Sequence, residues 1–223
     1  MRGLVIVFEG PEGVGKTTHV RLLAERLERA GVSCLTLREP GGTALGDQVR
    51  QLVLGPEHDV GVAAEALLFM ASRAELVERV IRPALEGGRV VLLDRFFLST
   101  YAYQVAGRGL PEDEVRAANH LATGGLVPDL TLLISKSAAA GQRRVARRGE
   151  RDRMERTGDA FHRRVAEAFE RFLEPAWQRA HPECGPIVGI DGRGSVAEVS
   201  GRVASILATR FPETFAALAE SHQ

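Results

Sequence analysis

A glycine-rich segment near the N-terminus constrains the fold more than any other feature. Residues 10–17 read Gly-Pro-Glu-Gly-Val-Gly-Lys-Thr, which fits the pattern G-x-x-x-x-G-K-[ST] without a gap. The apolar run at Leu4–Glu9 predicts a strand before this segment, and the apolar stripe of Thr17–Ala30 predicts a helix after it. A strand, this loop and a helix in that order form a phosphate-binding P-loop, which belongs to parallel α/β sheets.

The rest of the chain alternates short strands with longer helices. We expect four more strands, at Ser33–Arg38, Arg89–Asp94, Asp129–Ser135 and Pro186–Asp191. We expect further helices at Ala44–Leu54, Ala63–Glu86 (with a break at Pro83), Glu112–Thr123, Ala138–Arg148, Ala160–Ala180 and Val196–Thr209. This alternation predicts an α/β fold with a parallel five-stranded sheet and helices on both faces. Residues 1–210 are predicted to form a single domain, followed by a tail, 211–223, that is partly ordered at best.

Composition excludes several classes of protein. The 223 residues suffice for one α/β domain, and the formal net charge of zero gives no general attraction to nucleic acid or membrane. The two cysteines, Cys34 and Cys184, form no CxxC pair, which argues against a disulfide framework or a metal cluster. No apolar run approaches the length of a signal segment or a membrane span. We therefore expect a cytoplasmic protein that binds neither nucleic acid nor membrane.

The residue types of the P-loop suit a nucleoside triphosphate and its Mg²⁺. Lys16 can bridge the β- and γ-phosphates, the helix that follows directs its positive end at them, and the Thr17 hydroxyl can ligate the metal. Asp94 follows four apolar strand residues, so it is a second candidate for holding Mg²⁺. The residues expected to bind the triphosphate are Gly10, Pro11, Glu12, Gly13, Val14, Gly15, Lys16, Thr17 and Thr18.

Three classes of P-loop protein compete for this sequence. A GTPase switch needs Asn-Lys-x-Asp, but the only asparagine, Asn119, is followed by His120. A module that works on nucleic acid would need more chain and a basic face. A small-nucleotide kinase needs a clamp for the acceptor phosphate, for which Arg95 is suited, and a movable cationic cover. Residues 143–164 could form that cover, because they hold nine arginines against four acidic residues.

Five segments together resemble the bacterial thymidylate kinases, from Leu4 to about Ala180. They are 8–18 (Phe-Glu-Gly-Pro-Glu-Gly-Val-Gly-Lys-Thr-Thr), 38–43 (Arg-Glu-Pro-Gly-Gly-Thr), 67–73 (Leu-Leu-Phe-Met-Ala-Ser-Arg), 94–104 (Asp-Arg-Phe-Phe-Leu-Ser-Thr-Tyr-Ala-Tyr-Gln) and 128–131 (Pro-Asp-Leu-Thr). The resemblance implies a nucleoside monophosphate kinase-like fold with an arginine-rich lid at about 141–157. It also implies a homodimer that catalyses ATP + dTMP → ADP + dTDP with Mg²⁺. The alternatives are a kinase for another monophosphate, or a P-loop binding module that hydrolyses nucleotide slowly.

The resemblance also implies roles for individual residues. Phe69 would stack on thymine, Arg73 would bond the base edge, and Tyr103 would pack against the sugar. Glu12 would face the 3′-hydroxyl of the acceptor or its phosphate. The full set implied to bind the acceptor is Glu12, Glu39, Arg50, Phe69, Arg73, Arg95, Ser99, Thr100, Tyr103 and Gln104. The set implied to act in transfer is Lys16, Asp94, Arg95, Arg148 and Arg153.

Two positions depart from the pattern of this family. The fourth strand ends in Leu133-Ile134-Ser135, and Asp94-Arg95 is followed by Phe96-Phe97-Leu98, where many relatives carry an aspartate. Neither departure removes a group that phosphoryl transfer needs. Outside these motifs, we expect His19 on the exposed face of its helix and Trp177 in helix packing.

Overall fold

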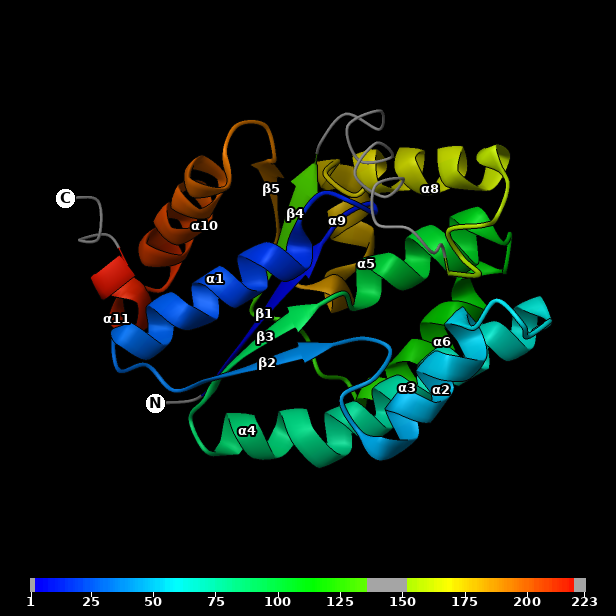
Figure 1. Cartoon of the computed structure of the whole chain (residues 1–223), viewed down its shortest axis with the longest axis horizontal. Helices are drawn as coiled ribbons and strands as arrows, with labels where there is room; N and C mark the ends of the chain where they lie inside the picture. The colour runs from blue at the N-terminus through cyan, green and yellow to red at the C-terminus, as the bar shows by residue number, and fades with distance from the viewer. Residues whose placement is uncertain (1–2, 136–151, 219–223) are drawn as a thin grey trace.

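The strand that precedes the P-loop lies at the centre of the sheet. In the computed structural model, which describes residues 3–135 and 152–218, five strands pair in the order β2-β3-β1-β4-β5 and every pairing is parallel. The predicted α/β fold class is confirmed (Figure 1). The strands are β1 (Leu4–Glu9), β2 (Cys34–Arg38), β3 (Val90–Asp94), β4 (Leu130–Ser135) and β5 (Ile187–Asp191).

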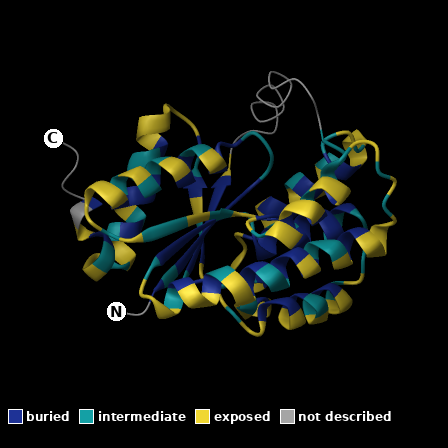
Figure 2. Cartoon of the chain, turned by 60° about the horizontal axis from the view of Figure 1, so that its bottom comes forward, coloured by how far each residue is buried: buried dark blue, intermediate teal, exposed yellow. Residues whose placement is uncertain are grey.

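Both faces of the sheet are covered, and β1 shows how the sequence achieves this. Val5 and Val7 point to one apolar core, and Ile6 and Phe8 point to the other; all four are buried. Helices α1 (Lys16–Arg29) and α10 (Val196–Arg210) line the core of Phe8, whereas α4 (Arg82–Glu86) lines the core of Val5. A strand buried on both faces needs no polar alternation, which explains its continuous apolar run. Figure 2 shows the buried strands between helices with exposed outer surfaces.

The predicted break at Pro83 is wrong. The chain stays helical from α3 (Val62–Leu76) through a π-helical segment, Val77–Ile81, into α4. The Arg82 N–H donates to the Val77 carbonyl, five residues back, which widens the turn just before the proline. Pro83 directly follows this wider turn, as the second residue of α4.

The predicted single helix at Ala160–Ala180 is also wrong. It is two helices, because α8 (Asp159–Arg171) ends before Pro175, and Pro175 begins α9 (Pro175–Ala180). The segment after Asp94 forms α5 (Phe97–Thr100) followed by a π-helical stretch, Tyr101–Gly107. The remaining helices are α2 (Ala44–Leu54), α6 (Glu112–Thr123) and α11 (Pro212–Phe215).

The C-terminal segment packs against the helices of one face. Phe215 and Leu218 are buried in the core of α1 and α10, and Arg26 donates to the Leu218 carbonyl oxygen at 2.7 Å. His19 was expected to be exposed, which is wrong, because α10 covers that side of α1 and Ser200 Oγ lies 3.1 Å from His19 Nδ1. Within the described part of the chain, every helix is too short or too polar to cross a membrane.

The pairing of β1 with β3 positions the functional residues. Phe8 lies opposite Asp94 in the register, and the Arg95 N–H donates to the Phe8 carbonyl oxygen at 3.0 Å. The P-loop and the Asp94-Arg95 pair therefore leave the sheet side by side, at the carboxyl ends of neighbouring strands. Ligands bind at this edge in open parallel sheets.

Candidate active site

The loop between β1 and α1 has the backbone shape of a phosphate-binding loop. Gly10 and Gly15 have φ angles of 134° and 103°, which residues with side chains rarely adopt. A Cβ atom at Gly10 would lie 2.3 Å from the carbonyl oxygen of Ile134 on β4. This tight turn places the N-terminus of α1, with its partial positive charge, at the carboxyl edge of the sheet.

Lys16 is the first residue of α1, and its side chain folds back over the loop. Its Nζ donates to the carbonyl oxygens of Gly10 at 2.8 Å and Pro11 at 2.9 Å. Burial, and to a smaller extent the nearby Arg95 guanidinium, lower the pKa of Lys16 to about 7, because the surrounding carboxylates oppose these two effects only in part. A polyphosphate bound at this loop would favour the charged form of Lys16.

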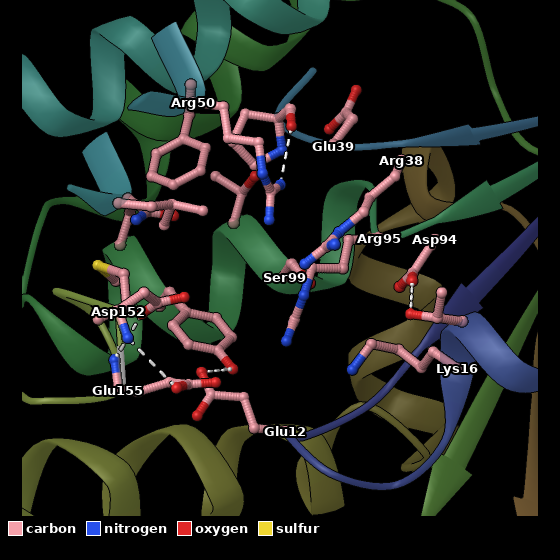
Figure 3. A pocket seen from close by; sticks show the side chains of 18 of the residues that line it. Glu12, Lys16, Arg38, Glu39, Arg50, Asp94, Arg95, Ser99, Asp152 and Glu155 are labelled. Carbon is pink, nitrogen blue, oxygen red and sulfur yellow. Dashed lines mark hydrogen bonds between the residues drawn. The ribbon is translucent and has the colours of Figure 1, made fainter. Parts of the chain in front are cut away.

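Thr17 and Asp94 bring together the two oxygen ligands that the sequence predicts for Mg²⁺. Thr17 Oγ1 donates to Asp94 Oδ2 at 2.5 Å (Figure 3). Within residues 3–135 and 152–218, no cluster of three or more His, Cys, Asp or Glu side chains could hold a metal ion. One hydroxyl and one carboxylate instead fit Mg²⁺, which takes most of its ligands from phosphate and water.

A buried carboxylate, Glu9, organises the turn that follows β3. Glu9 accepts hydrogen bonds from the Phe96 N–H at 2.7 Å, the Ser99 N–H at 3.0 Å and Ser99 Oγ at 2.7 Å. Arg95 lies inside this turn with φ at 78°, the one non-glycine residue with positive φ in the described ranges. Ser99 Oγ also accepts from Arg95 Nη1 at 3.0 Å, so Glu9 and Ser99 together fix the guanidinium. Our sequence reasoning gave Glu9 no role, although an acidic residue that ends a buried strand was a usable signal.

Arg95 extends over the ring of Tyr103, 5.1 Å from its centroid. The Tyr103 hydroxyl in turn donates to Glu12 Oε1 at 3.1 Å. Burial raises the pKa of Tyr103 well above its ordinary value, so the hydroxyl keeps its proton. The Tyr103 hydroxyl thereby holds the carboxylate of Glu12, which lines the same cavity as Lys16 and Arg95.

Positive side chains from four elements converge on one space. Lys16, Arg38, Arg50 and Arg95 all line it, and Figure 3 shows Lys16, Arg38 and Arg95 extending into the same opening. Arg50 is held by a bond from Nη1 to the Pro40 carbonyl oxygen at 3.0 Å. Burial lowers the pKa of Arg50, and the like charge of Arg38 adds to this effect. Such a cluster is built to receive an anion, and Arg38 is a member to which our sequence reasoning gave no role.

The opposite wall of the same cavity is formed by residues expected to contact a base. Phe69 on α3 lies there with Arg73, one turn further along the helix, and with Thr100 and Gln104 from the helix after β3. Phe69, Arg95 and Lys16 thus line one cavity, which brings a residue expected to bind the triphosphate together with two expected to bind the acceptor. From the loop, Glu12, Gly13, Gly15, Lys16 and Thr17 line this cavity; Val14 is buried in the core, and Thr18 lies in the first turn of α1.

Arg73 differs from its expected role, because each of its five N–H groups already has a protein acceptor. Nε and Nη2 bind the carboxylate of Glu39, with Nη2 2.5 Å from Oε2. Nη1 donates to Thr100 Oγ1 at 3.0 Å and to Asn119 Oδ1, and Nη2 also donates to the Phe96 carbonyl oxygen at 3.0 Å. Burial raises the pKa of Glu39, although its ion pair with Arg73 opposes the shift. A base could therefore bond Arg73 only by replacing one of these acceptors.

Of the two arginines expected to act from the lid, the structure describes Arg153 but not Arg148. Arg148 lies outside the described residues, as do the expected helix Ala138–Arg148 and most of the expected lid at 141–157. Arg153 does not line the cavity; its Nη2 lies 2.5 Å from Oε2 of the buried Glu65, which attracts the guanidinium away from the cavity. Three other residues of the expected lid segment, Asp152, Met154 and Glu155, do line the cavity.

Comparison with known proteins identifies the family. A family model described as "Thymidylate kinase" matches residues 8–181. The chain belongs to the thymidylate kinase family. The match includes the P-loop, the Asp94-Arg95 turn and both walls of the cavity, and it confirms the resemblance drawn from the five sequence segments.

Individual thymidylate kinases are similar over most of the chain. The protein of that name from Synechococcus sp. (strain JA-2-3B'a(2-13)) is 47% identical over 209 residues, which cover 94% of this chain and 96% of the relative. The Deinococcus radiodurans thymidylate kinase is 50% identical over 168 residues, 75% of this chain and 82% of the relative. The Pseudomonas fluorescens thymidylate kinase is 45% identical over 208 residues, 93% of this chain and 96% of the relative.

We predict that Glu9→Ala destabilises the protein by about 2 kcal/mol. The buried Phe96 N–H and the partly buried Ser99 N–H both lose their acceptor, at about 1–3 kcal/mol for a buried group. The free energy of unfolding in urea, extrapolated to water, measures this loss. The matched control is Glu28→Ala on the exposed side of α1, expected to change stability by about 0.5 kcal/mol or less. Equal stability of the two variants would contradict the role given to Glu9.

Proposed function

We propose that this chain transfers the terminal phosphoryl group of MgATP to dTMP, giving ADP and dTDP. One observation carries the proposal: a single cavity is lined by the P-loop lysine, by a cluster of arginines and by Phe69. The membership of the thymidylate kinase family supports the same reaction. Transfer of this kind needs alignment and charge neutralisation rather than a covalent intermediate on the protein.

In this proposal the donor triphosphate lies along the P-loop. The backbone of Gly10–Thr18 and the N-terminus of α1 hold the phosphates, and Lys16 exchanges its two carbonyl acceptors for phosphate oxygens. Thr17 and Asp94 would hold Mg²⁺, which supplies charge neutralisation at the transferring group when bound. Their hydrogen bond at 2.5 Å supports this assignment, because it places the hydroxyl oxygen and the carboxylate oxygen next to each other.

The acceptor occupies the remainder of the cavity, with its phosphate towards Lys16. Arg50 and Arg95 clamp that phosphate, and Ser99 keeps the Arg95 guanidinium in place. Phe69 stacks on the base, while Thr100 and Gln104 meet its edge. Tyr103 packs against the sugar, and Glu12, bonded to Tyr103, lies near the 3′-hydroxyl. Glu39 acts through Arg73, whose position it fixes.

In this proposal, positive charge from the lid also acts on the transferring phosphoryl group. Arg148 remains our candidate for neutralising the transferring phosphoryl group, on the basis of the family resemblance. Arg153 was a candidate for the same task, but its contacts with Glu65 support a role in holding the polypeptide beside the cavity. The functional unit that we propose is a cytoplasmic homodimer, and the exposed Leu45, Leu52 and Leu67 on α2 and α3 offer an apolar surface for the second copy.

The acceptor assignment predicts turnover that depends on dTMP. We expect rapid ADP release when dTMP is added with MgATP, and far slower release with dAMP, dGMP or dCMP, because the cavity would read one base edge. The kcat/KM for dUMP should be lower than that for dTMP by about 10–200-fold, because one buried methyl group gives discrimination of this size. A coupled assay of ADP release measures each acceptor. Slow turnover that no acceptor stimulates would instead identify a binding module, and preference for another monophosphate would identify a different kinase.

The pKa of Lys16 predicts uptake of a proton when ATP binds. Lys16, with a pKa of about 7 in the free protein, is mostly neutral at about pH 8, whereas bound phosphates favour its charged form. Binding should therefore take up close to one proton at about pH 8 and almost none at about pH 6, so affinity falls as pH rises above 7. Titration calorimetry in buffers of different ionisation enthalpy counts these protons. Zero uptake at about pH 8 would contradict the shifted pKa.

A further inference from the structure

Another buried carboxylate, Glu65, contacts Gln104, one of the residues that line the cavity. It lies in the first turn of α3, is fully buried and does not line the cavity. Gln104 Nε2 donates to Glu65 Oε1 at 3.0 Å, and Gln104 itself does line the cavity. Two guanidinium groups, from Arg108 at 2.9 Å and Arg153 at 2.5 Å, balance the charge of the carboxylate. The reaction proposed above gives Glu65 no task.

The carboxylate of Glu65 is held in one position from two sides. Arg108 binds it through both Nε and Nη2, and the Arg108 guanidinium lies over the Phe161 ring at 4.8 Å. Arg153 is anchored in turn, because its Nε donates to the Val53 carbonyl oxygen at 2.9 Å. With both arginines fixed by neighbouring elements, Glu65 Oε1 stays directed at Gln104.

An acceptor held in this way decides the orientation of the Gln104 amide. The oxygen and nitrogen ends of a glutamine side chain are nearly equal in shape, so its neighbours select between the two orientations. A carboxylate only accepts hydrogen bonds, and therefore the NH₂ group of Gln104 must face Glu65. No donor among residues 3–135 and 152–218 reaches Gln104 Oε1. This oxygen, a hydrogen-bond acceptor, is left for the contents of the cavity.

We propose that Glu65 is a positioning residue that sets the base selectivity of the acceptor site through Gln104. With its oxygen presented to the cavity, Gln104 favours a base whose ring nitrogen carries a hydrogen. Thymine and uracil have such an N3–H group, whereas N3 of cytosine is an acceptor and would face another acceptor. This inference rests on the proposed dTMP kinase activity, and it assigns the rejection of cytosine to a residue outside the cavity.

The test is the variant Glu65→Gln, assayed with dTMP, dCMP and dUMP. A neutral amide at position 65 can donate as well as accept, so Gln104 is free to turn and present its NH₂ group to cytosine. We expect the ratio of kcat/KM for dTMP to that for dCMP to fall roughly tenfold or more. The ratio for dTMP to dUMP should not change, because both bases carry N3–H. A role in folding alone would lower all three activities together and leave both ratios unchanged, which would overturn the proposal.

Two further variants separate Glu65 from its surroundings. Arg108→Lys keeps a positive charge beside Glu65, and Arg153 still holds the second oxygen of the carboxylate. Glu65 therefore remains an acceptor for the Gln104 amide, and the dTMP to dCMP ratio should stay near that of the unchanged protein. Gln104→Met removes the amide, and it should lower this ratio even if Glu65→Gln does not fold. Full selectivity in Gln104→Met would overturn the inference. If the unchanged protein shows no turnover with dTMP, the proposed function fails, a result distinct from selectivity that persists without Glu65.

Discussion

The parallel pairing of β1 with β3 is the contact on which the site depends. Because Phe8 lies opposite Asp94, the P-loop and the Asp94-Arg95 turn emerge together from the sheet. A slip of this register by one residue would turn the side chains of a strand to the opposite faces of the sheet. Burial on both faces prevents such a slip, since Ile6 and Val7 each fill an apolar core. The hydrophobic packing of the sheet thereby fixes the distance between the donor groups and the acceptor groups.

Three buried carboxylates hold cationic and polar side chains of the cavity in position. Glu39 lines the cavity, whereas Glu9 and Glu65 do not. Glu9 fixes the turn that carries Arg95, Glu39 fixes Arg73, and Glu65 orients Gln104. A buried carboxylate is costly unless all its oxygens are paired, so each of these groups locks several donors at once. This arrangement explains how side chains as flexible as arginine and glutamine can present a fixed pattern of charge and hydrogen bonds to small nucleotides.

Local sequence patterns predicted most of the fold, and contacts between distant segments explain most of what they missed. All five strands and the P-loop were predictable, because apolar runs and glycine spacing are read within a few residues. The break at Pro175 was equally local and should have been recognised. In contrast, the pairing of Arg153 with Glu65 joins residues 88 positions apart, and Glu9 meets Ser99 across 90 positions. No local sequence pattern links residues so far apart, so only the folded chain identifies these pairings.

The central claim is that two nucleotides share one cavity, with their phosphates meeting between Lys16 and Arg95. A molecule in which adenosine and thymidine are joined through five phosphates would occupy both sites at once. Titration calorimetry should show one molecule bound per chain, with an affinity at least about a hundredfold above that of ATP or dTMP alone, and displacement of both nucleotides. Binding no tighter than that of ATP, with dTMP still able to bind beside it, would contradict the claim.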